Sequence, residues 1–299
     1  MKKNLVEMSF PLVSIITPSF NQGRFILQTI TSVLGQDYAP LEHIVIDGGS
    51  SDNTLDVLRA YQDRLTFLSE PDKGQADAVN KGFERARGSI LGWLNSDDIY
   101  EPHAVRTVVD FFQQNPRAVM VYGDAKFINT DGGVEGYYPS KPFSMKGLAE
   151  TCIISQPATF IRADVVRDVG PLDVSLTTCM DYDYWIRIAE RYGGSRIAYL
   201  EGRWLARARL HDETKTSLMR KTAFREGALT VQKHFGFISA TWAAGFVQEV
   251  SLPERYPWFK DANIVVKAFL RWFYTARIFG LKTGIGSVLL SLKRPRNMR

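Results

Sequence analysis

Short hydrophobic runs alternate with helix-like stretches along the first part of the chain. Apolar runs typical of buried strands occur at 13–17, 43–47, 65–69, 90–94 and 119–122. Between them, amphipathic patterns predict helices at 25–34, 54–61, 75–85 and 103–112. This alternation predicts an α/β fold with a mainly parallel sheet of four or more strands and right-handed helical crossovers.

The pattern changes after Tyr122. Short strand-like pieces and turns follow, then a predicted helix at 183–191 and strands near Ile197 and Leu205. Residues 218–299 are mostly helical in pattern, with Pro253 and Pro257 separating two stretches. We therefore expect one α/β domain over residues 1–217 and a helical C-terminal region over residues 218–299.

Composition adds little to the fold but narrows the setting. The 299 residues are 45% hydrophobic and 23% charged, as in ordinary globular proteins. Two cysteines argue against a disulfide framework, and no apolar run suited to a signal peptide follows Met1. These features predict a cytoplasmic protein.

The net charge of +5 is concentrated at one end of the chain. After Asp261 there are eight basic residues and no acidic one, so the remaining 29 basic residues are balanced by 32 acidic ones. Basicity is thus a property of the tail, and we predict no nucleic-acid partner for the core.

Adjacent carboxylates follow the apolar run at 90–94, in the segment Asn95-Ser96-Asp97-Asp98. In open α/β sheets, ligands bind outside the carboxyl ends of the strands. Carboxylate oxygens at that position suit Mg²⁺ or Mn²⁺ bound to a diphosphate. The alternative is that Asp97 and Asp98 only cap a helix that begins near Glu101.

Polar residues also follow the two earlier strands. Asp47 ends the second strand, where its carboxylate can accept a hydrogen bond from a base or ribose, and Ser50 lies in the flexible turn that follows. After the first strand comes Thr17-Pro18-Ser19-Phe20-Asn21, in which Pro18 fixes the turn and Phe20 offers an aromatic face. Three strand ends are thus expected to meet at one edge.

The segment Asp72-Lys73-Gly74 precedes the helix predicted at 75–85, and Asp77 lies in its first turn. A helix N-terminus attracts anions through its free N–H groups and its dipole. Lys73 and the Gly74 backbone are therefore candidates for contact with phosphate or ribose. The alternative is that Asp72 only caps a solvated helix.

Five motifs in this order resemble the family 2 glycosyltransferases, which are inverting enzymes of the GT-A fold. They are Thr17-Pro18-Ser19-Phe20-Asn21, Asp47-Gly48-Gly49-Ser50-Ser51-Asp52, Asp72-Lys73-Gly74, Asn95-Ser96-Asp97-Asp98 and Met180-Asp181-Tyr182-Asp183-Tyr184-Trp185. The resemblance covers residues 11–217. It implies a nucleotide-sugar donor, usually a UDP-sugar, held with Mn²⁺ or Mg²⁺ by a Rossmann-like sheet flanked by helices.

The resemblance also implies individual roles. Thr17 and Asp47 would lie beside the nucleoside, with Asp47 at the base, and Asp97 near the ribose or sugar. Asp98 is preferred as the metal ligand, but the first motif position is Asn95 or Ser96 rather than an acid, so the choice between the two aspartates stays open. The other implied donor-binding residues are Pro18, Phe20, Asn21, Ser50, Asp72, Lys73, Gly74, Asp77 and Asn95.

Inversion at the anomeric carbon needs a general base that deprotonates the acceptor hydroxyl. Asp181 matches the family position for this base, although Met180 replaces the glutamate that many relatives have there. Asp183 is the rival base, and a simple helix-capping role for Asp181 is the structural alternative. The resemblance also suggests His211 near the metal and diphosphate, and Gln156 and Trp185 near the sugar or acceptor.

The C-terminal segment from Lys260 to Lys282 has an uneven charge distribution at 100° per residue, with Phe269, Trp272 and Phe273 away from the basic side. Such a helix suits an anionic membrane surface, which predicts peripheral contact through 260–299 at the inner face of the cell membrane and a glycan or lipid-linked glycan acceptor. The alternative is packing on the catalytic domain or on a second subunit in a homodimer.

Other classes fit less well. A nucleotidyltransferase or dinucleotide oxidoreductase lacks support because no glycine-rich phosphate loop follows the first strand. A nucleotide-sugar-binding scaffold at a membrane, with an impaired catalytic site, is the remaining alternative, and Met180 favours it. We expect an inverting, metal-dependent glycosyltransferase in polysaccharide or glycolipid synthesis.

Overall fold

The computed structural model describes residues 10–212, 214–251 and 264–279. The chain divides into two compact units, each assembled from separated stretches. Unit 1 comprises Met1–Pro142, Ile154–Val174 and Ile188–Leu210, and unit 2 comprises Phe143–Ile153, Ser175–Arg187 and His211–Arg299. The sequence predicted a single boundary after residue 217, whereas each of these units combines separate stretches of the chain. The boundary after residue 217 stays a prediction.

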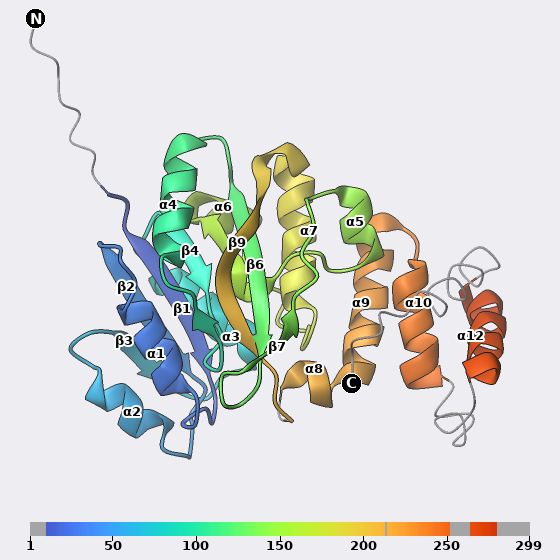
Figure 1. Ribbon diagram of the computed structural model, residues 1–299, viewed down its shortest axis with the longest axis horizontal. Helices are drawn as coiled ribbons and strands as arrows, with labels where there is room; N and C mark the ends of the chain where they lie inside the picture. The colour runs from blue at the N-terminus through green and yellow to red at the C-terminus, as the bar shows by residue number, and fades with distance from the viewer. Residues whose placement is uncertain (1–9, 213, 252–263, 280–299) are drawn as a thin grey trace, which may run out of the picture. The chain divides into compact units, whose positions relative to one another are not determined.

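Unit 1 contains all the strands of the described chain (Figure 1). Its elements are β1 (Val13–Ser19), α1 (Ile26–Leu34), β2 (Leu41–Asp47), α2 (Thr54–Ala60), β3 (Thr66–Ser69), α3 (Gln75–Arg85), β4 (Ile90–Trp93), β5 (Ile99–Tyr100), α4 (Ala104–Gln114), β6 (Met120–Ile128), β7 (Val134–Tyr137), the 3-10 helix η1 (Gln156–Ala158), β8 (Thr159–Arg162), α6 (Ala163–Val169), the 3-10 helix η2 (Gly194–Arg196) and β9 (Ile197–Arg209). Helix α7 (Met180–Tyr192) supplies residues to both units.

The sheet has the order β3-β2-β1-β4-β8-β6-β9-β5, and β7 pairs with β6. The first four strands are parallel, as are β6 and β9, while β8 runs antiparallel between β4 and β6. The predicted mostly parallel α/β sheet is therefore confirmed. Strand β6 extends to Ile128, beyond the predicted run at 119–122, because it pairs with β9 along most of its length.

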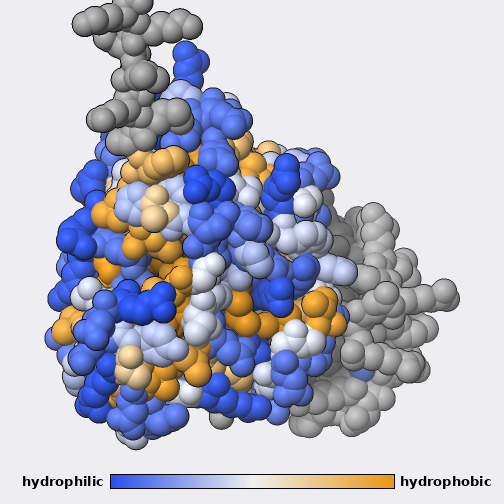
Figure 2. Space-filling view, turned by 60° about the vertical axis from the view of Figure 1, so that its left-hand side comes forward, coloured by the Kyte–Doolittle hydropathy of each residue, from blue (hydrophilic) through white to orange (hydrophobic). Residues whose placement is uncertain are grey.

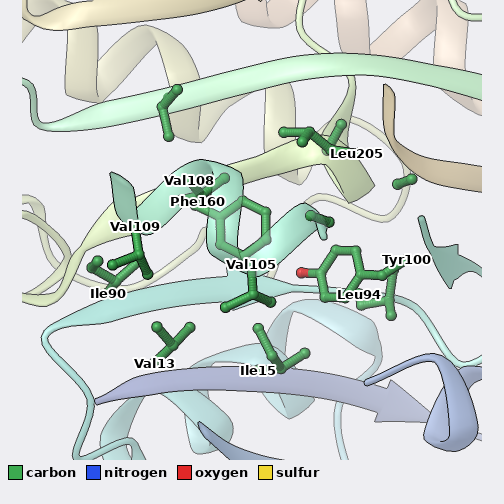
Figure 3. Packing of buried hydrophobic residues seen from close by; sticks show 14 of the residues in the cluster. Val13, Ile15, Ile90, Leu94, Tyr100, Val105, Val108, Val109, Phe160 and Leu205 are labelled. Atoms are coloured by element: carbon green, nitrogen blue, oxygen red, sulfur yellow. The ribbon is translucent and has the colours of Figure 1, made fainter. Parts of the chain in front are cut away.

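Alternating side chains of the parallel strands pack against helices on the two faces of the sheet. On one face, Val13 and Ile15 of β1 and Phe160 of β8 form a cluster with Val105 and Val108 of α4 (Figure 3). On the other face, Ile44 and Ile46 of β2 pack against Ala78 of α3. Burial on both faces explains why these strands are continuous hydrophobic runs rather than alternating ones.

Unit 2 is helical. Its elements besides the start of α7 are α5 (Met145–Glu150), α8 (Lys215–Leu218), α9 (Arg220–Phe235), α10 (Ala240–Phe246), the π-helix η3 (Val247–Ser251) and α12 (Ile264–Phe279). Helices α9 and α10 meet at Gly227, where a Cβ atom would lie 2.3 Å from the ring of Trp242. Within the described ranges, no helix is both long and apolar enough to cross a membrane.

The surface is mostly polar on the side that Figure 2 shows, with hydrophobic patches between charged side chains. This side therefore offers both polar and apolar contacts. Two aromatic side chains near strand ends are well exposed: Phe20, after β1, at 59% and Tyr137, the last residue of β7, at 62%.

Candidate functional site

The ends of β1, β2 and β4 bring three of the predicted motifs to one edge of the sheet in unit 1. Ser19 pairs with Asp47 in the parallel register, and the N–H of Gly48 donates to the Ser19 carbonyl at 2.8 Å. On the other side of β1, the N–H of Leu94 donates to the Ile16 carbonyl at 2.9 Å. An open sheet with polar loops at the carboxyl ends of its strands is the arrangement in which α/β proteins bind nucleotides.

Asp47 is buried and organises the turn that follows β2. Its Oδ2 accepts hydrogen bonds from the N–H groups of Gly49 and Ser50 and from the Ser69 hydroxyl, at 2.7–3.1 Å. Its Oδ1 accepts only the Ser50 hydroxyl among the described residues. Gly49 has a φ of 86°, a backbone conformation that favours glycine. The turn thus holds Asp47 firmly while Oδ1 keeps capacity for a second donor.

The loop after β1 is tied to the same turn. The Asn21 N–H donates to Ser50 Oγ at 2.7 Å, and Asn21 Oδ1 accepts the Ser51 N–H at 2.9 Å. Thr17 is fully buried, with its hydroxyl 2.9 Å from Nε2 of His43. Burial lowers the pKa of His43 to about 3, so this histidine is neutral. Pro18 is also buried, which leaves Phe20 and Asn21 as the exposed residues of the loop.

The Asp72-Lys73-Gly74 segment lies beside the Asp47 turn. A Cβ atom on Gly48 would lie 2.7 Å from Oδ2 of Asp72, while Oδ1 of Asp72 accepts the Gly74 N–H at 2.8 Å. At the start of α3, Oδ2 of Asp77 accepts the Lys73 N–H at 3.1 Å. That backbone hydrogen bond lowers the pKa of Asp77, and nearby Lys81 adds to the effect.

Asn95 is the centre of a hydrogen-bond network after β4. Its Oδ1 accepts from Gln75 Nε2 at 2.7 Å and from Trp93 Nε1 at 2.9 Å. Its Nδ2 donates to Oδ2 of Asp98 at 3.2 Å and to Oε1 of Gln156 at 3.1 Å. Gln156 in turn donates to the Trp93 carbonyl at 2.6 Å. The Asn95 amide is therefore fully used inside the protein, while Gln156 uses its oxygen and its nitrogen once each.

Asp97 and Asp98 differ in accessibility. Asp98 is 4% exposed, and its Oδ1 accepts the N–H of Arg209 at 2.9 Å, so both of its oxygens have donors. Burial and the neighbouring charge of Asp97 raise the pKa of Asp98. Asp97 keeps part of its surface exposed, while its carbonyl accepts from Nε of Arg209 at 2.9 Å.

Of these two carboxylates, Asp97 is the more exposed. Among the described residues, no three His, Cys, Asp or Glu side chains cluster in a way that could hold a metal ion. A Mg²⁺ ion bound to a nucleotide typically takes only one or two carboxylates, with phosphates and water as its other ligands. Asp97 reaches solvent with part of its surface, whereas Asp98 is buried with a donor on each oxygen.

Asp181 and Asp183, both in the first turn of α7, also differ. In the described chain, the Asp181 carboxylate accepts one hydrogen bond, at 2.8 Å from the N–H of Tyr182, and burial raises its pKa to about 6. Asp183 is fully buried, and its oxygens accept from Lys233, His234 and Arg187 at 2.8–2.9 Å. Burial alone would raise the pKa of Asp183, but these partners lower it.

The remaining candidates lie in unit 2. Trp185 is 1% exposed, and its Nε1 is buried without a hydrogen-bond acceptor in the described chain. His211 is half-buried, and its carbonyl accepts the N–H and hydroxyl of Thr214 at 3.0 and 2.9 Å.

Two residues of structural importance were not predicted from the sequence. Arg209 binds the Asp97–Asp98 segment and the carbonyls of Asn129 and Thr130, and Glu226 binds the segment before α7. A signal was available for Arg209, which ends a strand-like run directly before His211. Nothing in the sequence around Glu226 pointed to its role.

Residues 14–169, just over half of the chain, match the model of glycosyl transferase family 2, and the chain belongs to this family. It is 25% identical over 273 residues to an uncharacterized glycosyltransferase of Rickettsia bellii, covering 85% of this chain and 36% of that protein. It is 29% identical over 196 residues to a chondroitin synthase of Escherichia coli, covering 63% of this chain and 29% of that protein. The chain thus spans about a third of the length of these curated relatives.

Solved structures confirm the predicted GT-A fold. Staphylococcus aureus TarS 1–349 in complex with UDP-GlcNAc superposes with a TM-score of 0.62 at 16% identity, covering 94% of this chain and 91% of that one. The mannosyltransferase PcManGT from Pyrobaculum calidifontis, in complex with GDP-Man and Mn²⁺, gives a TM-score of 0.61 at 15% identity, covering 96% and 88%.

Proposed function

We propose that this protein transfers a sugar from a nucleotide diphosphate-sugar, most simply a UDP-sugar, to an acceptor hydroxyl with inversion at the anomeric carbon. The observation that supports this best is the meeting of three polar strand ends at one edge of the parallel sheet, in a chain of this family. Structural neighbours in complex with UDP-GlcNAc or with GDP-Man and Mn²⁺ support the class of donor.

The donor nucleotide is proposed to bind over the loops after β1 and β2. Oδ1 of Asp47 has capacity for a donor such as the imide N–H of uracil, and the exposed Phe20 ring offers a stacking surface. Thr17, Pro18 and Ser50 are buried and shape the loops. The exposed Asn21, Lys73 and Gly74, with the partly exposed Asp72 and Asp77, are the proposed contacts to ribose and phosphate.

We propose Asp97 as the direct ligand of the divalent cation, in place of the initially preferred Asp98. The basis is exposure, since part of the Asp97 side chain reaches solvent while Asp98 is buried. Asn95 makes four hydrogen bonds within the protein. Bound at Asp97, Mn²⁺ or Mg²⁺ would supply positive charge to the leaving diphosphate. His211 is kept as a proposed second ligand.

Asp181 is the proposed general base. A carboxylate with a pKa of about 6 is mostly ionised at neutral pH yet basic enough to accept the proton of the attacking hydroxyl. Asp183 is the weaker candidate because Arg187, Lys233 and His234 occupy its oxygens. Gln156 and Trp185 remain proposed acceptor-side residues that shape the surroundings, since both are buried.

The test is a panel of UDP-sugars and GDP-mannose with Mn²⁺ or Mg²⁺, with nucleotide release and donor binding measured for wild type, Asp97→Ala and Asp181→Asn. We expect turnover by wild type, loss of cation-dependent donor binding in Asp97→Ala, and loss of turnover with donor binding intact in Asp181→Asn. Donor binding without turnover in wild type would favour the scaffold alternative. No donor binding with either cation would refute both.

The acceptor is proposed to be a glycan or lipid-linked glycan, reached by peripheral contact at the inner face of the membrane. Of the segment 260–299, residues 264–279 are described and form α12, and the rest lies outside the described residues. Phe269 and Phe273 are 58% and 42% exposed, with Arg277 exposed one turn further on the same face. Tyr274 and Thr275 are buried, so α12 has one packed and one exposed face.

Vesicle co-sedimentation tests the membrane contact. Full-length protein should sediment with vesicles containing an anionic phospholipid and much less with neutral vesicles, and Phe269→Ser/Phe273→Ser should weaken this binding several-fold. Leu229→Ser, which alters a 53% exposed residue of α9, is the control. Equal sedimentation of all variants would contradict the proposal, and a change of oligomeric state in the double variant would instead identify this face as a dimer contact.

A further inference from the structure

The segment directly before α7 is held by a single carboxylate from α9. Oε1 of Glu226 accepts the N–H of Thr177 at 2.9 Å. Oε2 accepts the N–H groups of Thr178 and Cys179 at 2.8 and 3.1 Å, and the Thr178 hydroxyl at 2.6 Å. Burial would raise the pKa of Glu226, but these hydrogen bonds outweigh burial and lower it. Three successive backbone N–H groups thus converge on one ionised side chain.

Two further contacts hold the first turn of α7 on either side of Asp181. Trp242 Nε1 donates to the Tyr182 hydroxyl at 3.3 Å, and that hydroxyl donates to the Leu148 carbonyl. Asp183 binds Lys233 and His234, which lie near the end of α9. Residues 177–179, 182 and 183 are therefore all anchored within unit 2.

Asp181 lies within this anchored stretch but has a different environment. Its carboxylate receives no hydrogen bond from α9 or α10 in the described chain, only that of the Tyr182 N–H. The backbone on both sides of Asp181 is fixed, while the carboxylate keeps lone pairs that can accept a proton. Fixed geometry with spare acceptor capacity is what a general base requires.

We propose that Glu226 is a positioning residue, which sets the first turn of α7 so that Asp181 is aligned for proton abstraction. The inference rests on the proposed function of Asp181 as general base.

The test uses Glu226→Gln in the full-length protein. Glutamine keeps one acceptor oxygen. Its NH₂ group replaces the other oxygen and faces N–H groups that donate hydrogen bonds to that oxygen in the wild type. We expect kcat to fall about 10- to 100-fold, as for a small displacement of a catalytic group, while the Kd of the donor stays within about twofold. Glu249→Gln is the matched control, because Glu249 pairs with Arg220 away from α7 and should leave kcat unchanged.

A double-mutant cycle separates positioning from a general effect on the fold. If Glu226 acts through Asp181, adding Glu226→Gln to Asp181→Asn should change the residual rate little. An equal loss in both backgrounds would overturn the inference, as would an unchanged kcat in Glu226→Gln. Should Glu226→Gln fail to fold, Thr178→Val removes only the hydroxyl hydrogen bond and should lower kcat a few-fold, and an unchanged rate there would overturn the inference.

The two proposals fail differently. If Asp181→Asn retains the wild-type kcat, the assignment of the base is wrong, whatever Glu226→Gln does. If Asp181→Asn loses activity and Glu226→Gln does not, only the positioning role is wrong.

Discussion

Two pairs of carboxylates show the same difference in burial between their members. One pair is Asp97 and Asp98 in unit 1, and the other is Asp181 and Asp183 in unit 2. Asp98 and Asp183 are buried, and donors occupy both oxygens of each. Asp97 keeps exposed surface, and Asp181 accepts one hydrogen bond in the described chain. In each pair, one member is buried within a hydrogen-bond network, and the other is partly exposed.

The pairs differ in how the buried member is stabilised. Asp98 accepts hydrogen bonds from the backbone N–H of Arg209 and the side-chain amide of Asn95. Burial has the larger effect, so the pKa of Asp98 is raised. Asp183 accepts hydrogen bonds from the side chains of Lys233, His234 and Arg187, so its pKa is lowered in spite of burial. Neutral donors satisfy a buried carboxylate, but nearby cations are needed to keep it strongly ionised.

The sharpest test of the contrast in unit 2 is Asp181→Asn. Removing a general base should lower kcat about 10²- to 10⁴-fold, with donor affinity unchanged because the amide is isosteric. Steady-state kinetics and donor titration measure the two quantities. Retention of kcat would remove the distinction between Asp181 and Asp183.

Asp183→Asn should have the largest effect on stability. The amide removes the buried charge that pairs with Arg187 and Lys233. Removing one partner of a buried pair typically costs about 3–5 kcal/mol, and the 54% exposure of Lys233 places the expected cost at the lower end of that range. Urea unfolding measures the change. Asp168→Asn, at a surface pair with Arg191, is the control and should change stability little. Similar unfolding curves for both variants would show that Asp183 is not a structural anchor.

The ionisation of Asp181 should make the stability of the wild type depend on pH. Its pKa is about 6 in the folded protein against a usual 3.8, so the unfolded chain loses this proton at lower pH than the folded protein does. Stability present below pH 4 is therefore lost as pH rises through 6, by at most about 3 kcal/mol. Urea unfolding of wild type and Asp181→Asn at several pH values should show Asp181→Asn gaining relative stability over this range. A difference independent of pH would contradict the raised pKa.

In unit 1, Asp98→Ala and Asp97→Ala should separate folding from ligand binding. Asp98→Ala leaves the Arg209 N–H and one of the two Asn95 amide N–H groups without an acceptor, which should lower the free energy of unfolding by about 1–3 kcal/mol. Asp97→Ala should lower stability less and abolish Mn²⁺-dependent donor binding. If the two effects are exchanged, Asp98 is the metal ligand, as first preferred from the sequence.

Much of the fold followed from local patterns. The strands β1, β2 and β4 and the helices α1 and α3 lie where hydrophobic periodicity placed them, because each buries its side chains along its own length. The antiparallel insertion of β8 between β4 and β6 was not predicted. A run such as Thr159–Arg162 indicates a strand but not its partners, which lie tens of residues away.

The site was predicted as a set of residues rather than as a set of roles. The motifs named Asp97, Asp98, Asp181 and Asp183, but spacing alone did not distinguish the members of each pair. The distinction comes from Arg209, which is 111 residues from Asp98, and from Lys233 and His234, about 50 residues from Asp183. No local pattern encodes such partners.

The pairing of β9 with β6 bears on how this domain can be exchanged during evolution. The part that matches the family model stops at residue 169, yet β9 covers the edge of β6, and its last residue, Arg209, supplies a donor to Asp98. A gene segment cut at residue 169 would encode a sheet with an open edge, prone to pair with other chains. Any exchange of this domain between proteins is therefore expected to preserve a unit that reaches at least Leu210.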